Sequence, residues 1–474
     1  MIHRLLFVLL FVGIGGLAAC QQTPATSSVG IVPPVAAPEL FTAVPLPTLP
    51  PATATPLPAT LTPIPSPTPV TPTAVPPTPT PYYTGPLSPV CGQLLPILPT
   101  HTTPQTTALT PGAAALTAVQ NRIPQTAVAA WQYILNHPDN VGLVAYRVGN
   151  EANGVYLNAD VQMPLASVVK LIPLVAYVEA VSNGELDPAA PVPVDTLDAY
   201  YLPGYDLRSH NRALAELTDK GLINGNPPQA QLADVPWMMI RHSSNAAADY
   251  LHLLLGQERM EQTAVSLGLT SQTAPCTWLG QFMAMSNHTR SGSDDTAVRS
   301  YMSDGAGYGR EAGQLADAYI NDPAFREAER AWHQENRRPT VQTQRLFSHA
   351  LNAHGSAQEY AALMARIAQN GLSNPESSFL ARKYLEWPMV FADNQELFSN
   401  LGYKNGSLPG ILATAYYAYP KEEVTPIVVI LFFRDLPQPT YRQWRETLPH
   451  DEFARWLLYD PAAIAAVKSV IGNP

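Results

Sequence analysis

The spacing of apolar positions changes several times between residue 117 and the end of the chain. In residues 117–137, apolar side chains recur every three or four positions, which predicts an amphipathic helix. Residues 142–148 and 155–157 are short runs of strand-forming residues, and the segment 149–154 between them is rich in turn formers. The pattern predicts a β-hairpin directly after the helix.

The rest of the chain carries mainly helical patterns, followed by strands. From Ser167 to about residue 369 the spacing is largely helical. Residues 411–418 and 426–433 predict two strands, and residues 452–470 predict a closing helix. Because strands occur near both ends of this region, we expect an α/β fold in which both termini build one sheet covered by helices.

One charged side chain interrupts an apolar helical run. Lys170 is the only charged residue between Val161 and Val178, and the run is apolar nearly all round, so the helix is expected to be buried. A buried ammonium group is costly unless it is paired or neutral. Ser167 lies one turn earlier on the same face. A hydroxyl beside a desolvated amine is the arrangement of a nucleophile and its base.

Two further motifs follow this pair along the chain. Ser-Ser-Asn occupies residues 243–245, and Lys-Asn-Gly occupies residues 404–406. The chain therefore contains Ser-x-x-Lys, Ser-x-Asn and Lys-x-Gly in that order, which resembles the class A β-lactamases and the penicillin-binding DD-peptidases. Only Lys170 has a serine three positions before it, and only Lys404 has a glycine two positions after it.

The middle motif has a second candidate, Ser-His-Asn at residues 209–211, which is flanked by Arg208 and Arg212. We prefer residues 243–245 because a strong helical pattern follows them. The apolar stripe of that helix consists of Ala247, Tyr250, Leu251, Leu254 and Leu255.

The resemblance covers about residues 117–474 and implies a serine β-lactamase/DD-peptidase-like fold. In that fold a sheet packed by helices lies beside an all-helical lobe, with the site in the cleft between them. Residues 187–232 and 283–345 look like insertions relative to the family, and both could border the cleft.

The resemblance also implies roles in acyl transfer. Ser167 would be the nucleophile, at a helix start that favours developing negative charge. Lys170 would accept its proton if burial keeps part of the lysine neutral. Ser243 would pass a proton to the leaving nitrogen.

The remaining motif residues would bind the substrate. Asn245 would hydrogen-bond Lys170 and a substrate amide, and Lys404 and Ser407 would hold the substrate carboxylate. Gly406 would let the strand approach closely. The backbone N–H groups of Ser167 and Ser407 would form an oxyanion hole, worth roughly 3 kcal/mol per donor.

The chain departs from the class A pattern where a Glu on a loop normally activates the deacylating water. No Glu occurs between Glu261 and Glu311, and residues 273–283 contain no carboxylate. Asp294 and Asp295 lie farther on and could substitute only if their segment folds back over the cleft. Since losing a general base costs roughly 10²- to 10⁴-fold, we expect slow deacylation.

Two smaller departures concern the other motifs. Ser244 stands where the β-lactamases usually carry Asp, and residues 411–418 contain no Arg, which many relatives place there to bind a carboxylate.

The N-terminus has the features of a targeting segment. Arg4 precedes an apolar stretch at residues 5–17, and Leu-Ala-Ala-Cys at 17–20 resembles a bacterial lipobox. We expect cleavage before Cys20 and lipidation of that residue; the alternative is an ordinary secretory signal cut near Ala19. Either interpretation predicts an extracytoplasmic protein.

These features predict three regions: a signal peptide at 1–20, a Pro/Thr-rich linker at 21–115 and a catalytic domain at 116–474. The linker composition cannot bury a core and favours extended chain. After Cys20 only Cys91 and Cys276 remain, and they could pair or stay as free thiols.

The net charge and the spacing of the histidines argue against a nucleic-acid-binding protein and a metalloprotein. The net charge of −10, with no basic cluster in the domain, argues against nucleic-acid binding. The histidines show no metal-ligand spacing, so we infer no metal and no cofactor.

We therefore predict a lipid-anchored serine acyl-hydrolase that acts on β-lactams or peptidoglycan-type peptides. The alternatives are a DD-carboxypeptidase or transpeptidase, and a cell-wall-binding or β-lactam-sensing lipoprotein that acylates and stalls.

Overall fold

The computed structural model of the chain describes residues 82–83, 90–95, 97–98, 109, 112–288, 292–335 and 338–471. All of them belong to one unit, residues 79–474. The predicted signal peptide 1–20, with its lipidation site Cys20, and most of the predicted linker 21–115 lie outside the described residues.

Five of the described strands form one antiparallel sheet with the order β4-β3-β11-β10-β9. The predicted hairpin is confirmed, since β3 pairs with β4 directly. The prediction of one sheet from both ends of the domain is also confirmed, because β3 pairs with β11. The strands are β3 (Val141–Arg147), β4 (Val155–Leu157), β9 (Phe398–Leu408), β10 (Ile411–Pro420) and β11 (Ile427–Phe433).

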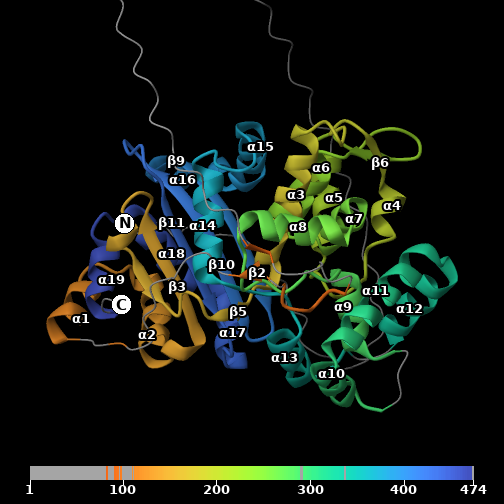
Figure 1. Cartoon of the computed structure of the whole chain (residues 1–474), viewed down its shortest axis with the longest axis horizontal. Coiled ribbons are helices and arrows are strands. Elements are labelled where there is room, and N and C mark those ends of the chain that lie inside the picture. The colour runs from red at the N-terminus through yellow and green to blue at the C-terminus, as the bar shows by residue number, and fades with distance from the viewer. Residues whose placement is uncertain are drawn as a thin grey trace, which may run out of the picture. The chain divides into compact units, whose positions relative to one another are not determined.

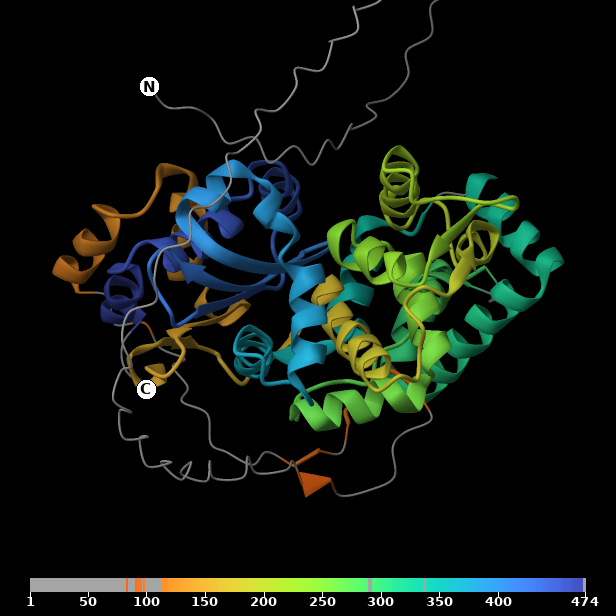
Figure 2. The same ribbon diagram turned by 90° about the horizontal axis from the view of Figure 1, so that it is seen from above.

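Both faces of this sheet are buried, so its central strand is apolar throughout. Along β11, Val429 and Leu431 pack into one hydrophobic cluster, and Val428 and Ile430 pack into another. The first cluster contains helices from the two ends of the domain: α1 (Ala113–Gln120), α2 (Val128–Asn136), α18 (Pro449–Tyr459) and α19 (Ala463–Ile471). The second contains α3 (Leu171–Ser182) and α14 (Ala357–Ala368). Figures 1 and 2 show α14 between the sheet and the helical lobe.

Two predicted helices are each divided by a proline. The helix predicted over 117–137 is α1, a 3₁₀ turn at Gln125–Ala127 and α2, with Pro124 at the break. The closing helix predicted over 452–470 is α18 and α19, with Pro461 between them. Proline lacks an N–H donor and disfavours helical geometry in the residue before it. The single-helix predictions were therefore wrong in both places.

The middle of the domain is helical, as predicted, and carries short two-stranded pairs. β5 (Gln162–Pro164) pairs with β8 (His354–Ser356), and β6 (Pro191–Pro193) pairs with β7 (Gln229–Gln231). Besides α3, the helices up to β8 are α4 (Val194–Asp198), α5 (Ser209–Asp219), α6 (Asp234–Arg241), α7 (Asn245–Leu255), α8 (Gln257–Leu267), α9 (Trp278–Ser286), α10 (Asp294–Ser303), α11 (Gly305–Asn321), α12 (Pro323–Glu335) and α13 (Val341–Ala350).

The remaining elements lead from α14 to the C-terminal strands and helices. They are α15 (Pro375–Leu385), a 3₁₀ turn at Trp387–Val390, α16 (Ala392–Leu397) and, after β11, α17 (Gln438–Thr447). Among the described residues, no helix combines the length and apolar character needed to cross a bilayer.

Of the two alternatives for the cysteines, the structure has the disulfide. Cys91 and Cys276 are bonded, with their Cα atoms 5.0 Å apart. Residues near Cys91 also pair with the segment before α9, where the Gly92 N–H donates to the Ala274 carbonyl over 2.8 Å. The end of the predicted linker is therefore attached to the segment that leads into α9.

Candidate active site

Ser167 lies on a 3₁₀ turn, Ala166–Lys170, that continues into α3. The predicted buried helix therefore begins as a tighter turn than expected. Ala166 has a φ of +45°, a left-handed conformation that costs energy in a residue other than glycine. Its backbone N–H donates to Asn352 Oδ1 over 3.0 Å, which helps to hold this geometry. Ser167 stays partly exposed at the turn, while its neighbours on both sides are buried.

Lys170 is completely buried. Its Nζ lies 2.7 Å from the Ser243 carbonyl oxygen, 2.7 Å from Asn245 Oδ1 and 3.3 Å from Ser243 Oγ. Nζ also lies 4.8 Å from the centre of the Trp278 ring. Burial lowers the pKa of Lys170 to about 7, against the opposing effect of Asp249 and Asp206. Near neutral pH the amine can therefore both accept and donate a proton.

The Ser-Ser-Asn segment at 243–245 connects α6 and α7 and supplies partners of Lys170. Ser243 has a φ of +60°, and Ser244 caps α7 by accepting a hydrogen bond from the Ala247 N–H over 3.2 Å. This tight turn brings the Ser243 carbonyl oxygen and the Asn245 side chain to the same amine. The choice of residues 243–245 as the middle motif agrees with this geometry.

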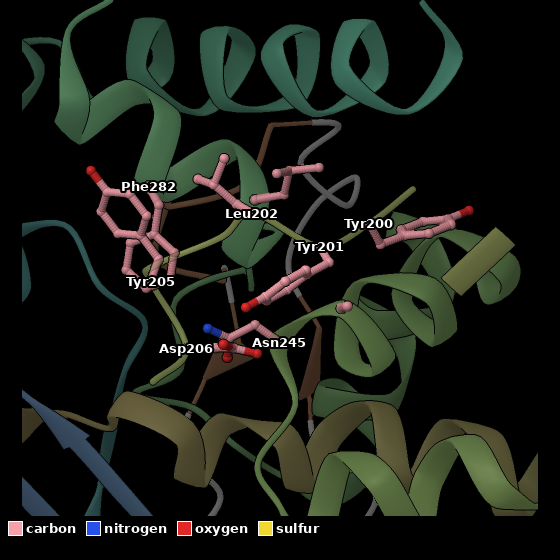
Figure 3. Close-up of a pocket in the computed structure, with 9 residues that line it drawn as sticks. Tyr200, Tyr201, Leu202, Tyr205, Asp206, Asn245 and Phe282 are labelled. Atoms are coloured by element: carbon pink, nitrogen blue, oxygen red, sulfur yellow. The ribbon is translucent and has the colours of Figure 1, made fainter. Parts of the chain in front are cut away.

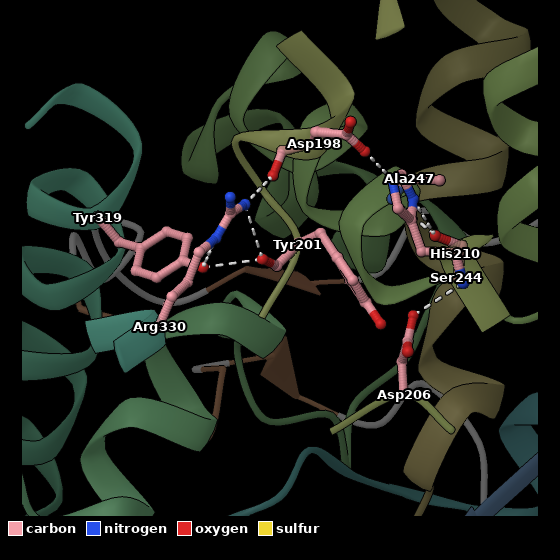
Figure 4. Close-up of polar contacts among 8 residues, drawn as sticks. All are labelled: Asp198, Tyr201, Asp206, His210, Ser244, Ala247, Tyr319 and Arg330. Carbon is pink, nitrogen blue, oxygen red and sulfur yellow. Dashed lines mark hydrogen bonds and ion pairs between the residues drawn. The ribbon is translucent and has the colours of Figure 1, made fainter. Parts of the chain in front are cut away.

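The alternative motif at 209–211 lies at the start of α5, and its His210 contacts the chosen motif at 243–245. His210 is buried, with its Nδ1 3.3 Å from Ser244 Oγ and its Nε2 2.8 Å from Asp198 Oδ1 (Figure 4). The predicted apolar stripe of α7 holds for Ala247 and Leu251, which are buried. It fails at Leu254, which is 44% exposed. His252 is buried on this helix instead.

Lys404, on β9, is the second buried amine of the site. Its Nζ donates to Ser243 Oγ over 3.1 Å and to the Asn405 carbonyl over 2.8 Å. Burial lowers the pKa of Lys404 well below its usual range, and the nearby charge of Lys170 lowers it further. The Ser243 hydroxyl therefore lies between two amines, each within hydrogen-bonding distance.

Gly406 brings the backbone of β9 against the Ser167 turn. A Cβ atom at position 406 would lie 2.7 Å from the Ser167 backbone nitrogen and 2.6 Å from the Leu165 carbonyl oxygen. Only glycine allows this approach. Next to it, Ser407 Oγ lies 2.9 Å from the hydroxyl of Tyr441 on α17.

The structure brings together all seven residues predicted for catalysis and substrate binding: Ser167, Lys170, Ser243, Asn245, Lys404, Gly406 and Ser407. The Ser167 hydroxyl, however, makes no hydrogen bond to the Lys170 amine. Such contacts are often long before a substrate binds.

Sequence reasoning missed Asp249, whose buried carboxylate orders the segment around Lys170. Its two oxygens accept hydrogen bonds from the N–H groups of Trp278 and Leu279, each over 2.7 Å. Burial raises the pKa of Asp249 to about 7, and both N–H groups and Lys170 act against that rise. These bonds position Trp278, whose ring lies near the Lys170 amine. The sequence did contain a signal for this residue, because Asp249 is the only carboxylate in the otherwise mainly apolar run at 246–251.

The predicted loop at 273–283 is shorter than expected, because α9 begins at Trp278. Asp295, considered as a substitute base, lies at the start of α10 and forms an ion pair with Arg299 over 2.8 Å.

The first insertion, 187–232, does border the site. Tyr200, Tyr201, Leu202, Tyr205 and Asp206 line a pocket together with Asn245 (Figure 3).

The chain belongs to the beta-lactamase enzyme family. The sequence model of that family matches residues 125–440, which is more than half of the chain and includes all three motifs. No curated protein matches the chain significantly.

Solved structures of this kind are also similar to the chain. A β-lactamase from Sphaerobacter thermophilus is 17% identical with a TM-score of 0.44, covering 70% of this chain and 96% of that chain. A β-lactamase from Chitinophaga pinensis is 14% identical with a TM-score of 0.43, covering 70% and 99%. A mutant of PBP-A, in an acyl-enzyme complex with penicillin G, is 15% identical with a TM-score of 0.39, covering 69% and 95%.

Proposed function

We propose that this protein is an extracytoplasmic serine acyl-hydrolase that forms an acyl-enzyme on Ser167 with β-lactams or peptidoglycan-type peptides. The observation that carries the proposal is the buried amine of Lys170, one turn after a partly exposed serine and held by Ser243 and Asn245. An amine whose pKa is lowered to about 7 is neutral in a large fraction of molecules near neutral pH and can then accept a proton, whereas an exposed lysine is almost fully protonated.

In the proposed acylation, Ser167 Oγ attacks the substrate carbonyl carbon while its proton passes to Lys170. The C–N bond of the substrate then breaks, and its nitrogen needs a proton. The Ser243 hydroxyl supplies it and recovers one from Lys170, whose Nζ lies 3.3 Å away. The Lys404 amine donates a hydrogen bond to Ser243 Oγ and so stabilises this oxygen during the exchange.

The developing charge on the substrate oxygen would be stabilised by the backbone N–H groups of Ser167 and Ser407. The close approach at Gly406 supports this assignment, because it brings the two backbone segments together. Each donor of such a pair is worth about 3 kcal/mol of transition-state stabilisation. Lys404 and Ser407 would hold the substrate carboxylate, with Ser407 oriented by Tyr441.

We further propose that a lipid on Cys20 anchors the protein outside the cytoplasm. The lipobox-like Leu-Ala-Ala-Cys at 17–20 supports this location, as does the disulfide between Cys91 and Cys276, since such bonds persist in oxidising compartments. The Pro/Thr-rich linker would then hold the catalytic domain away from the membrane.

The test is intact-protein mass spectrometry after incubation with benzylpenicillin or a fluorophosphonate probe. We expect wild type to gain the mass of one probe and Ser167→Ala to gain none while it remains folded. A Ser167→Ala protein that still gains the mass would exclude Ser167 as the nucleophile. Steady-state turnover would separate a hydrolase from a protein that acylates and stalls.

A further inference from the structure

A buried carboxylate next to the site has one oxygen with no hydrogen-bond partner. Asp206 is 8% exposed, and its Oδ2 accepts a hydrogen bond from the His210 backbone N–H over 2.9 Å at the start of α5. Its Oδ1 is buried and forms no hydrogen bond to any described residue. The His210 N–H uses Oδ2, and the Arg208 backbone N–H also acts on the carboxylate, but neither donates a hydrogen bond to Oδ1. An unsatisfied buried carboxylate oxygen is costly and calls for a ligand.

That carboxylate lines the pocket beside Asn245. In Figure 3 the Asp206 carboxylate and the Asn245 side chain lie next to each other, and the Tyr201 hydroxyl points toward them. Asn245 in turn contacts the Lys170 amine, and the charge of Lys170 acts on Asp206. The carboxylate therefore lies in the same pocket as Asn245, which is a direct partner of the candidate base.

The size of this pocket suits water rather than a whole substrate. The room for water-sized occupants in it is about 10 Å³. On this measure a cavity needs roughly 10–15 Å³ to hold one water molecule, so the space is at the lower limit for a single water and excludes a whole substrate. Aromatic and aliphatic side chains form much of the lining, which strengthens the interaction of any water with the carboxylate. These lining residues include Tyr205, Leu279 and Phe282.

The segment that carries Asp206 is held from two sides. Arg330 on α12 donates to the carbonyl oxygens of Asp198, over 2.6 Å, and Tyr201, over 3.3 Å (Figure 4). The Tyr319 hydroxyl on α11 also donates to the Tyr201 carbonyl, over 2.8 Å. The insertion at 283–345 therefore holds in place the part of the insertion at 187–232 that leads to Asp206. A general base must be held in this way to act efficiently.

We propose that Asp206 is the general base that activates the water for hydrolysis of the Ser167 acyl-enzyme. This inference rests on the proposed function and replaces the loop Glu of the class A pattern with a carboxylate from the insertion at 187–232. The expectation of slow deacylation considered only carboxylates after Ser243, and Asp206 precedes it. The structure thus offers a route to turnover.

The step balances as follows. A water held at Asp206 Oδ1 gives one proton to that oxygen, and the water oxygen forms a bond to the acyl carbonyl carbon. The bond from this carbon to Ser167 Oγ then breaks. Lys170 relays the proton from Asp206 to Oγ, so one water is consumed, a carboxylic acid product leaves, and both side chains return to their starting states.

The test compares wild type with Asp206→Asn in the full chain, using benzylpenicillin. Asn keeps an oxygen to accept the His210 N–H, so the start of α5 is preserved. We expect acylation within a few-fold of wild type and deacylation slower by about 10²- to 10⁴-fold. Quenched samples of the variant should accumulate the acyl-enzyme mass, with a burst of one equivalent. Asp206→Glu, which restores a carboxylate one methylene farther out, should recover part of the rate.

Asp295→Asn is the matched control, because it removes an exposed carboxylate that is paired with Arg299. It should deacylate like wild type. The inference is overturned if Asp206→Asn deacylates within threefold of wild type, if Asp295→Asn stalls instead, or if wild type itself stalls after one equivalent. Each of these results leaves acylation of Ser167 intact. Absence of any acyl mass on wild type would instead overturn the proposed function, and this inference with it.

Discussion

Gly406→Ala should damage acylation although it adds a single methyl group outside the reacting atoms. The new Cβ would lie 2.6 Å from the Leu165 carbonyl oxygen, 2.7 Å from the Ser167 nitrogen and 2.9 Å from the Ala166 Cβ. Two of these neighbours are backbone atoms, and no rotamer change can move them. The strand and the Ser167 turn must therefore separate.

The size of the effect follows from these distances. Carbon and oxygen normally approach to about 3.3 Å, so the two segments must move apart by about 0.7 Å. Overpacking of this kind costs typically 1–3 kcal/mol of stability. The same movement displaces the two N–H groups assigned to the oxyanion hole, and losing one such donor costs about 2.7–4 kcal/mol, or 10²- to 10³-fold in rate. We expect acylation to fall by about 10²-fold while the domain still folds.

The assay is single-turnover acylation by benzylpenicillin, followed by intact-protein mass spectrometry, with thermal unfolding measured in parallel. Gly313→Ala on α11 is the matched control, because a Cβ there meets no atom within 4 Å. It should keep the wild-type acylation rate and gain rather than lose stability, since alanine favours a helix by about 1 kcal/mol over glycine. The reasoning fails if Gly406→Ala acylates within threefold of wild type.

Three further predictions use the same assays. The acylation rate of wild type should rise with pH and level off above about pH 7. Only the neutral Lys170 amine accepts a proton, and burial lowers the pKa of Lys170 to about 7. A flat rate profile between pH 5 and 9 would contradict this prediction. Lys170→Ala should lower the acylation rate by about 10²- to 10⁴-fold. Lys404→Ala should mainly weaken substrate binding, raising KM by about 10- to 100-fold. If both variants lowered the maximal rate equally, the two lysines would not have separate roles. Cys20→Ser should release an active domain from the membrane fraction, and continued detergent-dependent partition of that variant would mean that another segment anchors the chain.

The sequence alone determined the features that depend on local spacing. Ser167 and Lys170 are one turn apart, so their proximity follows from any helical conformation. The strands of the sheet were also recognisable, because burial on both faces demands a continuous apolar run, as in β11. The signals for the breaks at Pro124 and Pro461 were present in the sequence too, and the single-helix predictions did not use them.

Only the tertiary structure decided which distant groups lie next to the motif residues Asn245 and Ser407. Asp206 and Tyr441 come from segments without a motif, and an isolated Asp or Tyr carries no periodic signal that marks it as buried. The turn geometry at Ala166 and Ser243 also arises from packing, since nothing in either residue favours a positive φ. The lowered pKa of Lys170 has the same origin, because it depends on complete desolvation by chain segments from several parts of the fold. Burial is a property of the assembled domain, and it converts an ordinary lysine and an ordinary aspartate into groups suited to moving protons.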